Sequence, residues 1–181
     1  MTFPWRDKAA PPTAFSLQSD GEALYFAFRV TDEDVVIIEG SPENERLVAQ
    51  GDRVEMFFAQ DLELKEYYSL EIDPKARVLD YRGSFYRRFD NEWEAPGLEV
   101  AARQRPDGYD VEGRLPFSAL ESMGLRPTSG EPLLAGVFRG EFSHGETTVE
   151  ESWISWVIPD AEKPDFHIPS SFGCLQLETG D

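Results

Sequence analysis

Charged side chains alternate with apolar ones in several segments of the chain, as polar groups on one face of a sheet do. Glu55 and Glu71 stand within apolar runs, and Arg82 lies at the end of the next run. Arg139 and Glu141 are two residues apart in a later apolar run. Carboxylate and guanidinium groups form planar, bidentate hydrogen bonds that suit neighbouring hydroxyl groups, such as those of a sugar. The pattern predicts a polar binding surface; the alternative is a set of surface ion pairs of about 0 to 1 kcal/mol each.

Aromatic side chains near such a surface could provide apolar stacking platforms. Trp153 and Trp156 are three residues apart, so on a regular strand they face opposite sides, and at most one is free to stack. Core or edge packing is favoured for Trp153, which leaves Trp156 as the candidate. Trp93 lies in a loop rich in acidic residues and is a second candidate, with simple loop packing as the alternative. Tyr81, next to Arg82, is a third.

Apart from its carboxylates, the chain has few residues that could bind a metal. With 2 His and 1 Cys, the chain has too few such ligands for a zinc site built from them. His167 lies between Phe166 and Ile168, where a structural histidine bonded to the backbone is commoner than a ligand. The many Asp and Glu residues leave Ca²⁺ open, but no loop has a spacing of oxygen ligands that specifies it.

The charge balance is strongly acidic, with 35 Asp and Glu against 17 Lys and Arg over 181 residues and a formal net charge of -18. Such a surface repels nucleic acid phosphates and anionic lipids, so neither nucleic acid nor a membrane is an expected partner. No segment approaches the roughly 18 to 20 apolar residues that span a bilayer. The first residues do not resemble a signal peptide, which predicts a cytoplasmic protein if Met1 is the native start and otherwise leaves export open.

Short segments with a period of two, separated by turn residues, predict strands that bury one face. They lie at residues 24–30, 35–38, 52–59, 67–72, 77–82, 98–103, 109–115, 133–142, 151–158 and 172–177. The turns at 73–76 and 107–108 predict two hairpins. Helical pieces are expected at 42–50, where Gly51 forms the C-terminal cap, and at 117–123, where Pro116 is the first helical residue.

These elements predict an all-β fold, an antiparallel β-sandwich of immunoglobulin-like or jelly-roll-like type with short helical pieces. The length suits a single domain over residues 1–181, with a Pro-rich irregular arm at 1–14. The single Cys174 excludes an internal disulfide framework. The oligomeric state is left open.

The order of these segments resembles that of the family 9 carbohydrate-binding modules and their relatives, a wider group that includes the haem-binding DOMON domains. The first matching segment, 51–58, reads Gly-Asp-Arg-Val-Glu-Met-Phe-Phe. The others are 67–74, 78–82, 97–101, 108–120, 138–141 and 156–177. The likeness covers nearly the whole chain, and the order of the segments makes it specific.

The resemblance implies non-catalytic binding of a sugar or glycan chain end on one concave sheet face, in a bacterial protein of polysaccharide metabolism. It implies that Glu55 accepts hydrogen bonds from sugar hydroxyls and that Arg82 assists. Well-known members stack the sugar between two Trp side chains, but Ala49 and Gln50 stand where the first aromatic is expected. The motif Phe-His-x-Pro around His167 also matches, and related modules carry calcium. The expected ligand-binding residues are Glu55, Arg82, Tyr81, Glu71, Trp93, Arg139, Glu141, Trp156 and His167.

Two other functions fit the same fold. A pair of carboxylates roughly 5 to 10 Å apart can cleave glycosidic bonds, so an intracellular glycoside hydrolase is one alternative. A haem-binding or protein-interaction domain of the DOMON type is the other. Haem is not expected, because Met56 shares an apolar strand face with Val54 and Phe58 and is predicted to lie in the core.

Overall fold

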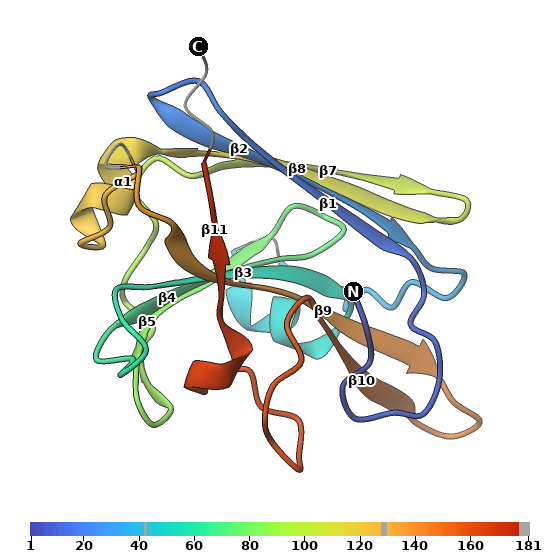
Figure 1. Ribbon diagram of the computed structural model, residues 1–181. Helices are drawn as coiled ribbons and strands as arrows, with labels where there is room; N and C mark the ends of the chain where they lie inside the picture. Colours follow the sequence, from blue (N-terminus) through green and yellow to red (C-terminus); the bar gives the residue numbers. More distant parts are fainter. Residues whose placement is uncertain (42, 128–129, 178–181) are drawn as a thin grey trace.

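The computed structural model describes residues 1–41, 43–127 and 130–177, and its strands form two antiparallel sheets (Figure 1). The smaller sheet has the order β1-β2-β8-β7, made of Thr13–Ser19, Ala23–Thr31, Gly108–Pro116 and Glu99–Arg105. The larger sheet has the order β10-β9-β3-β4-β5-β6, made of Val149–Ser155, Leu133–His144, Arg53–Ala59, Tyr67–Ile72, Val78–Ser84 and Arg88–Asp90. β11 (Gly173–Leu175) pairs with β9. The predicted antiparallel β-sandwich is confirmed.

The two sheets enclose the main hydrophobic core. Every second side chain of the central strands points into it, as the period of two predicts. β2 contributes Leu24, Phe26, Phe28 and Val30, and β3 contributes Val54, Met56 and Phe58. The predicted apolar face of Val54, Met56 and Phe58 is therefore confirmed, Met56 is a core residue, and Arg53, Glu55 and Phe57 point to the other side of β3.

β3 is buried on both faces, although only one of them meets the other sheet. The C-terminal segment covers its outer face and forms a second cluster there, in which Phe166 and Phe172 pack with Phe57 and Phe138. The rings of Phe138 and Phe166 stack with their centroids 4.0 Å apart. This cover turns the outer face of the larger sheet into an enclosed environment.

The prediction of a strand at 35–38 was wrong. The segment has no regular secondary structure, and its backbone is hydrogen-bonded to Asp52, in the loop before β3, and not to a neighbouring strand. The N–H of Asp52 donates to Val36 O at 2.8 Å, and the N–H of Val36 donates to Asp52 Oδ2 at 2.6 Å. Gly51 makes this approach possible, because a Cβ there would lie 2.5 Å from Val36 O. Gly51 is the C-cap of the preceding helical turn, but its φ of −144° is extended and not left-handed. Glycine is therefore needed here for the close approach of Val36 and not for a left-handed backbone.

β1 was not predicted, and the irregular arm predicted at 1–14 is two residues too long, because residues 13 and 14 already belong to β1 and pair with β2. β6 was not predicted, and β10 ends at Ser155, so that Trp156 lies beyond it. β11 is shorter than the predicted strand at 172–177.

The helical pieces are short. They are the 3-10 turns η1 (Glu45–Gln50) and η2 (Pro169–Ser171) and the helix α1 (Phe117–Ser122). Pro116 is the N-cap of α1 and not its first helical residue, and Pro42, the start of the first predicted helical piece, lies outside the described residues. Within the described ranges, no helix has the length and apolar character needed to cross a membrane.

The core leaves no room for a methyl group at Gly113 of β8. An ideal Cβ there would lie 2.1 Å from Cζ of Phe26 on the neighbouring strand. We expect Gly113→Ala to lower the free energy of unfolding by about 1 to 3 kcal/mol, because the core must shift to accept it. Chemical denaturation measures this. The control is Glu112→Ala at the adjacent exposed position, which should change stability by less than about 0.5 kcal/mol; equal effects of the two variants would contradict the packing explanation.

Candidate ligand-binding site

The strand register brings polar and aromatic side chains of four strands together on the outer face of the larger sheet. Glu55 of β3 lies opposite Glu71 of β4 and opposite Phe138 of β9. One row further along, Arg53 and Trp153 both lie opposite Gly140. Residues that face one another across antiparallel strands share a face, so these side chains gather in one place.

Arg53 is the centre of the polar group. Its Nε donates to Glu71 Oε2 at 2.6 Å and lies 3.0 Å from Glu55 Oε1. All three side chains are at most 6% exposed. Tyr81 of β5 adds a hydrogen bond, in which its hydroxyl donates to Glu71 Oε1 at 3.0 Å. Charges removed from water need partners of this kind, because an unpaired buried charge is costly.

A glycine lets Arg53 lie flat against the sheet. A Cβ at Gly140 would lie 2.7 Å from Arg53 Nη1, so any other residue would displace the guanidinium. In this position Arg53 Cζ lies 5.2 Å from the centre of the Trp153 ring, a cation–π distance. Trp153 is half-buried and therefore keeps part of its surface accessible.

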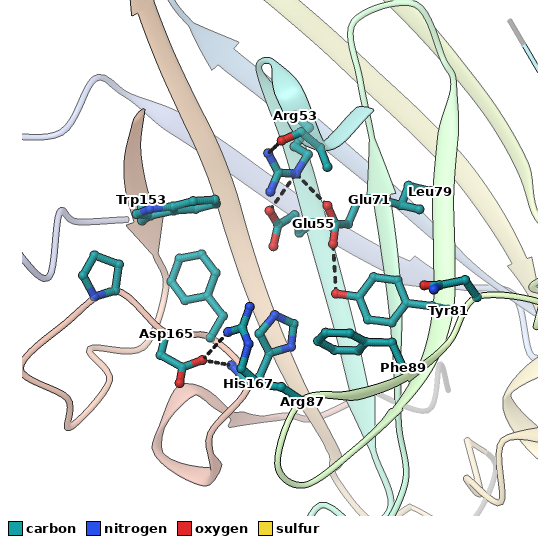
Figure 2. A pocket seen from close by; sticks show the side chains of 14 residues that line it. Arg53, Glu55, Glu71, Leu79, Tyr81, Arg87, Phe89, Trp153, Asp165 and His167 are labelled. Atoms are coloured by element: carbon teal, nitrogen blue, oxygen red, sulfur yellow. Dashed lines mark hydrogen bonds and ion pairs between the residues drawn. The ribbon is translucent and has the colours of Figure 1, made fainter. Parts of the chain in front are cut away.

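The other side of the site is also aromatic. Phe89 of β6 packs edge-on against Tyr81, with ring centroids 5.1 Å apart, and is 41% exposed. Figure 2 shows Trp153 on one side of the pocket and Tyr81 with Phe89 on the other, with Glu55 and Glu71 between them. The floor is thus polar and two opposing walls are aromatic.

The C-terminal segment and the turn between β5 and β6 close one side of the pocket. Asp165 joins them, since its carboxylate accepts hydrogen bonds from Arg87 Nη1 at 3.1 Å and from the Tyr86 hydroxyl at 2.5 Å. The same carboxylate accepts the N–H of His167 at 2.9 Å and holds that residue in the wall. His167 Nδ1 shares a hydrogen bond of 2.9 Å with the Tyr67 hydroxyl.

Burial changes the proton affinities of two groups in the site. Burial and the neighbouring Glu71 raise the pKa of Glu55, although Arg53 acts in the opposite direction. Burial, with a smaller contribution from Arg87, lowers the pKa of His167 to about 4, so its imidazole is neutral at pH 7. Glu55 Oε1 contacts the guanidinium but has no well-directed hydrogen bond among the described residues, and this oxygen is itself inaccessible to solvent. The Glu55 side chain also lines the cavity.

The cavity between these walls has a volume of about 320 Å³. That is at the lower end of the roughly 300 to 1,000 Å³ typical of small-molecule pockets. Besides the residues named above, Ala49, Leu79, Asn91 and Pro164 line it. A small ligand with several hydroxyl groups and apolar C–H faces matches both the polar floor and the aromatic walls.

Four of the residues predicted from the sequence meet in this cavity: Glu55, Glu71, Tyr81 and His167. Arg82 faces the other side of β5, opposite Tyr68 of the main core, and its guanidinium pairs with Asp90 at 2.8 Å and Glu66 at 3.6 Å. It lines a separate groove at the sheet edge.

The structure does not bring the other four predicted residues to this cavity. Arg139 lies opposite Val54 and so faces the space between the sheets, and Glu141, two residues further, pairs with it there. Trp93 packs on Tyr68 with ring centroids 4.9 Å apart. Trp156 is 40% exposed and packs beside Gly173, outside the cavity.

Several residues of the cavity were missed. Arg53 stands two residues before Glu55 on the same predicted strand face, so the alternation that selected Glu55 could have selected it too. Trp153 was assigned to core or edge packing, although its place on β10, opposite Gly140, puts its side chain on the outer face of the sheet with Arg53. Arg87 and Asp165 lie in a turn and in the C-terminal segment, and Phe89 lies in the three-residue strand β6, which is too short for a periodicity to indicate how side chains point.

Among the described residues, one group of carboxylates has a spacing suited to a metal ion. Oxygen atoms of Asp32, Asp52 and Glu141 all lie within 4.8 Å of one another. The group lies apart from the cavity, and the guanidinium of Arg139 already pairs with Asp32 and Glu141. A guanidinium repels a divalent cation, so these residues as arranged do not fit Ca²⁺.

Solved structures with the same fold include carbohydrate-binding proteins. A candidate carbohydrate-binding protein from Bacteroides uniformis is 19% identical, with a TM-score of 0.69, over 98% of this chain and 84% of that chain. A family 9 carbohydrate-binding module from Caldicellulosiruptor kristjanssonii in complex with glucose is 17% identical, with a TM-score of 0.65, over 99% and 84%. The cellotriose complex of a family 9 module from the same organism is 17% identical, with a TM-score of 0.64, over 96% and 78%.

Sequence comparison assigns the family. No curated protein sequence matches the chain. The family model described as carbohydrate family 9 binding domain-like matches residues 3–180, which is nearly the whole length. The chain therefore belongs to the carbohydrate family 9 binding domain-like family.

Proposed function

We propose that this protein binds, without cleaving it, the terminal unit of a glycan in the cavity on the outer face of the larger sheet. The observation that carries the proposal is the buried Arg53–Glu55–Glu71 group placed between two aromatic walls. Membership of a carbohydrate-binding family supports it, as do related structures in complex with glucose and cellotriose.

Recognition would use polar and apolar contacts together. Glu55, which lines the cavity, accepts hydrogen bonds from ring hydroxyls, and Arg53 holds both carboxylates in a fixed orientation. Trp153 offers an indole face to the C–H side of the sugar, and Phe89 offers a second apolar surface opposite. These two residues take over the stacking role that the family resemblance led us to expect near Ala49, which lines the same cavity.

The closed side of the cavity favours a chain end over the middle of a chain. Asp165 ties the turn carrying Arg87 to the C-terminal segment, so a polysaccharide has no continuous groove to follow past this point. Affinity should be modest, because the sugar hydroxyls exchange good hydrogen bonds to water for those to the protein.

The geometry favours binding over hydrolysis. A glycosidase needs one carboxyl group to deliver a proton and another to act as base or nucleophile. Here Arg53 contacts both Glu55 and Glu71, and the Tyr81 hydroxyl occupies the second oxygen of Glu71. The two carboxylates are thus held as one hydrogen-bonding unit.

Removing the acceptor or the stacking surface should weaken binding in different ways. We expect Glu55→Gln to lose about ten- to a hundredfold in affinity, because a hydrogen bond to a charged group contributes roughly 1.5 to 3 kcal/mol. Trp153→Ala should lose about tenfold, the effect of one apolar stacking surface. Isothermal titration calorimetry with glucose and cello-oligosaccharides, after a glycan array of the wild type, measures this. Trp156→Ala is the matched control and should bind like the wild type; a folded wild-type protein that binds no glycan would reject the proposal.

Affinity should depend on pH through Glu55. Its pKa is raised by burial and by Glu71, so the protonated form persists above the usual range, and only the carboxylate accepts charge-assisted bonds on both oxygens. Affinity should therefore increase as the pH rises from about 6 to about 9. His167, with a pKa of about 4, stays neutral throughout this window. The increase should vanish in Glu55→Gln, and an equal slope in that variant would assign the dependence to another group.

A further inference from the structure

A second buried arginine lies on the opposite face of the larger sheet, at the end of the space between the sheets. The Arg139 side chain is 0% exposed. Its Nη2 donates to Asp32 Oδ2 at 2.9 Å and contacts the Glu141 carboxylate, while Nη1 donates to Thr31 O at 3.1 Å and Thr13 Oγ1 at 3.2 Å. The guanidinium is therefore surrounded by two carboxylates, a backbone carbonyl and a hydroxyl.

This set of oxygen atoms is the set that hard divalent cations use. Calcium takes six to eight oxygen ligands from carboxylates, backbone carbonyls and water. A third carboxylate, that of Asp52, lies in the same group, with one oxygen from each of the three acids within 4.8 Å of the others. Asp52 is fixed by the N–H groups of Val36 at 2.6 Å and Phe142 at 3.1 Å.

Three carboxyl groups, those of Asp32, Asp52 and Glu141, lie together beside one guanidinium in this cluster. A second observation concerns Tyr109, which is fully buried and whose hydroxyl has no hydrogen-bond partner among the residues that the structure describes. Tyr109 lies opposite Val30 of β2, which immediately precedes Thr31 and Asp32 in the chain, and the charges of the four residues of the cluster act on its hydroxyl. An unpaired hydroxyl at a cluster of carboxylates is an available further oxygen ligand.

We propose that Arg139 occupies a divalent-cation site with its guanidinium, so that the wild-type protein needs no metal there and loss of this side chain opens a site for Ca²⁺. The observation that carries the proposal is the all-oxygen environment of Arg139, in which its nitrogen atoms contact Asp32, Glu141 and Thr31 while Asp52 remains beside them. The inference concerns the opposite face from the sugar site and does not depend on the proposed function.

Thermal unfolding of Arg139→Ala in EDTA and in millimolar CaCl₂ tests the proposal. The variant should have a lower Tm than the wild type in EDTA, because three buried carboxylates lose their cation, and CaCl₂ should restore most of the loss. The wild-type Tm should be the same in EDTA and in CaCl₂. A variant whose Tm stays low in CaCl₂ would overturn the proposal, as would a wild-type Tm that falls in EDTA. Should Arg139→Ala fail to fold in EDTA, refolding in CaCl₂ is the readout, and failure there also overturns it.

Two further variants separate a specific site from general stabilisation. Arg77→Ala is the matched control, because Arg77 is also buried and pairs with a single carboxylate, Asp73, and with Ile38 O. It should lower the Tm without recovery in CaCl₂. Asp52→Asn in the Arg139→Ala background should abolish the recovery, because Asp52 supplies the carboxylate that Arg139 leaves free. Luminescence of Tb³⁺, sensitised by Tyr109, should appear with Arg139→Ala and be absent with the wild type; the reverse would contradict the proposal.

Discussion

The buried charge of Arg53 is the constraint on which the arrangement of the larger sheet depends. Its guanidinium lies on the outer face of the central strand, and a charge at that depth needs partners that water would otherwise supply. Glu55 and Glu71 meet this need from the same strand and from its neighbour. Removing one partner from such a group costs roughly 3 to 5 kcal/mol. The pairing of β3 with β4 is therefore fixed by charge on one face and by apolar packing on the other.

The C-terminal segment makes this environment. Without it the outer face of the larger sheet would be exposed to solvent, and the ion pairs there would contribute little. Phe166 packs on Phe138 and Asp165 binds the turn after β5, so one segment both excludes water and forms the closed wall of the cavity. The same contacts that stabilise the sheet therefore define the cavity's shape, and stability and binding are linked through residues 164–167.

The fold was largely predictable from the sequence, whereas the site was predictable only in its strand residues. Alternation of polar and apolar residues decides which way a strand side chain points, and this identified Glu55 and Glu71 and the core role of Met56. Alternation does not show to which face of the sheet each set of side chains belongs. Arg139 was therefore predicted to lie with Glu55, although it lies opposite Val54 and points the other way. Phe89 lies in a strand of only three residues and Asp165 in an irregular segment, so their positions depend on tertiary contacts between distant segments. The failed strand at 35–38 has a similar cause, because the backbone of Val36 is satisfied by Asp52, a residue whose side chain carries no strand signal.

Two buried arginines on adjacent strands, Arg53 and Arg139, show that guanidinium–carboxylate pairs can either line a binding site or only stabilise the fold. Both are nearly inaccessible and both face two carboxylates. Arg139 is enclosed between the sheets, where its donors are also taken up by a carbonyl and a hydroxyl of the first two strands. Arg53 lies at the floor of a cavity that Glu55 and Glu71 also line. A polar group enclosed between two sheets can only stabilise the fold, while one that borders a cavity can also bind a ligand. The distinction lies in access to the cavity, because both arginines are buried and both pair with two carboxylates.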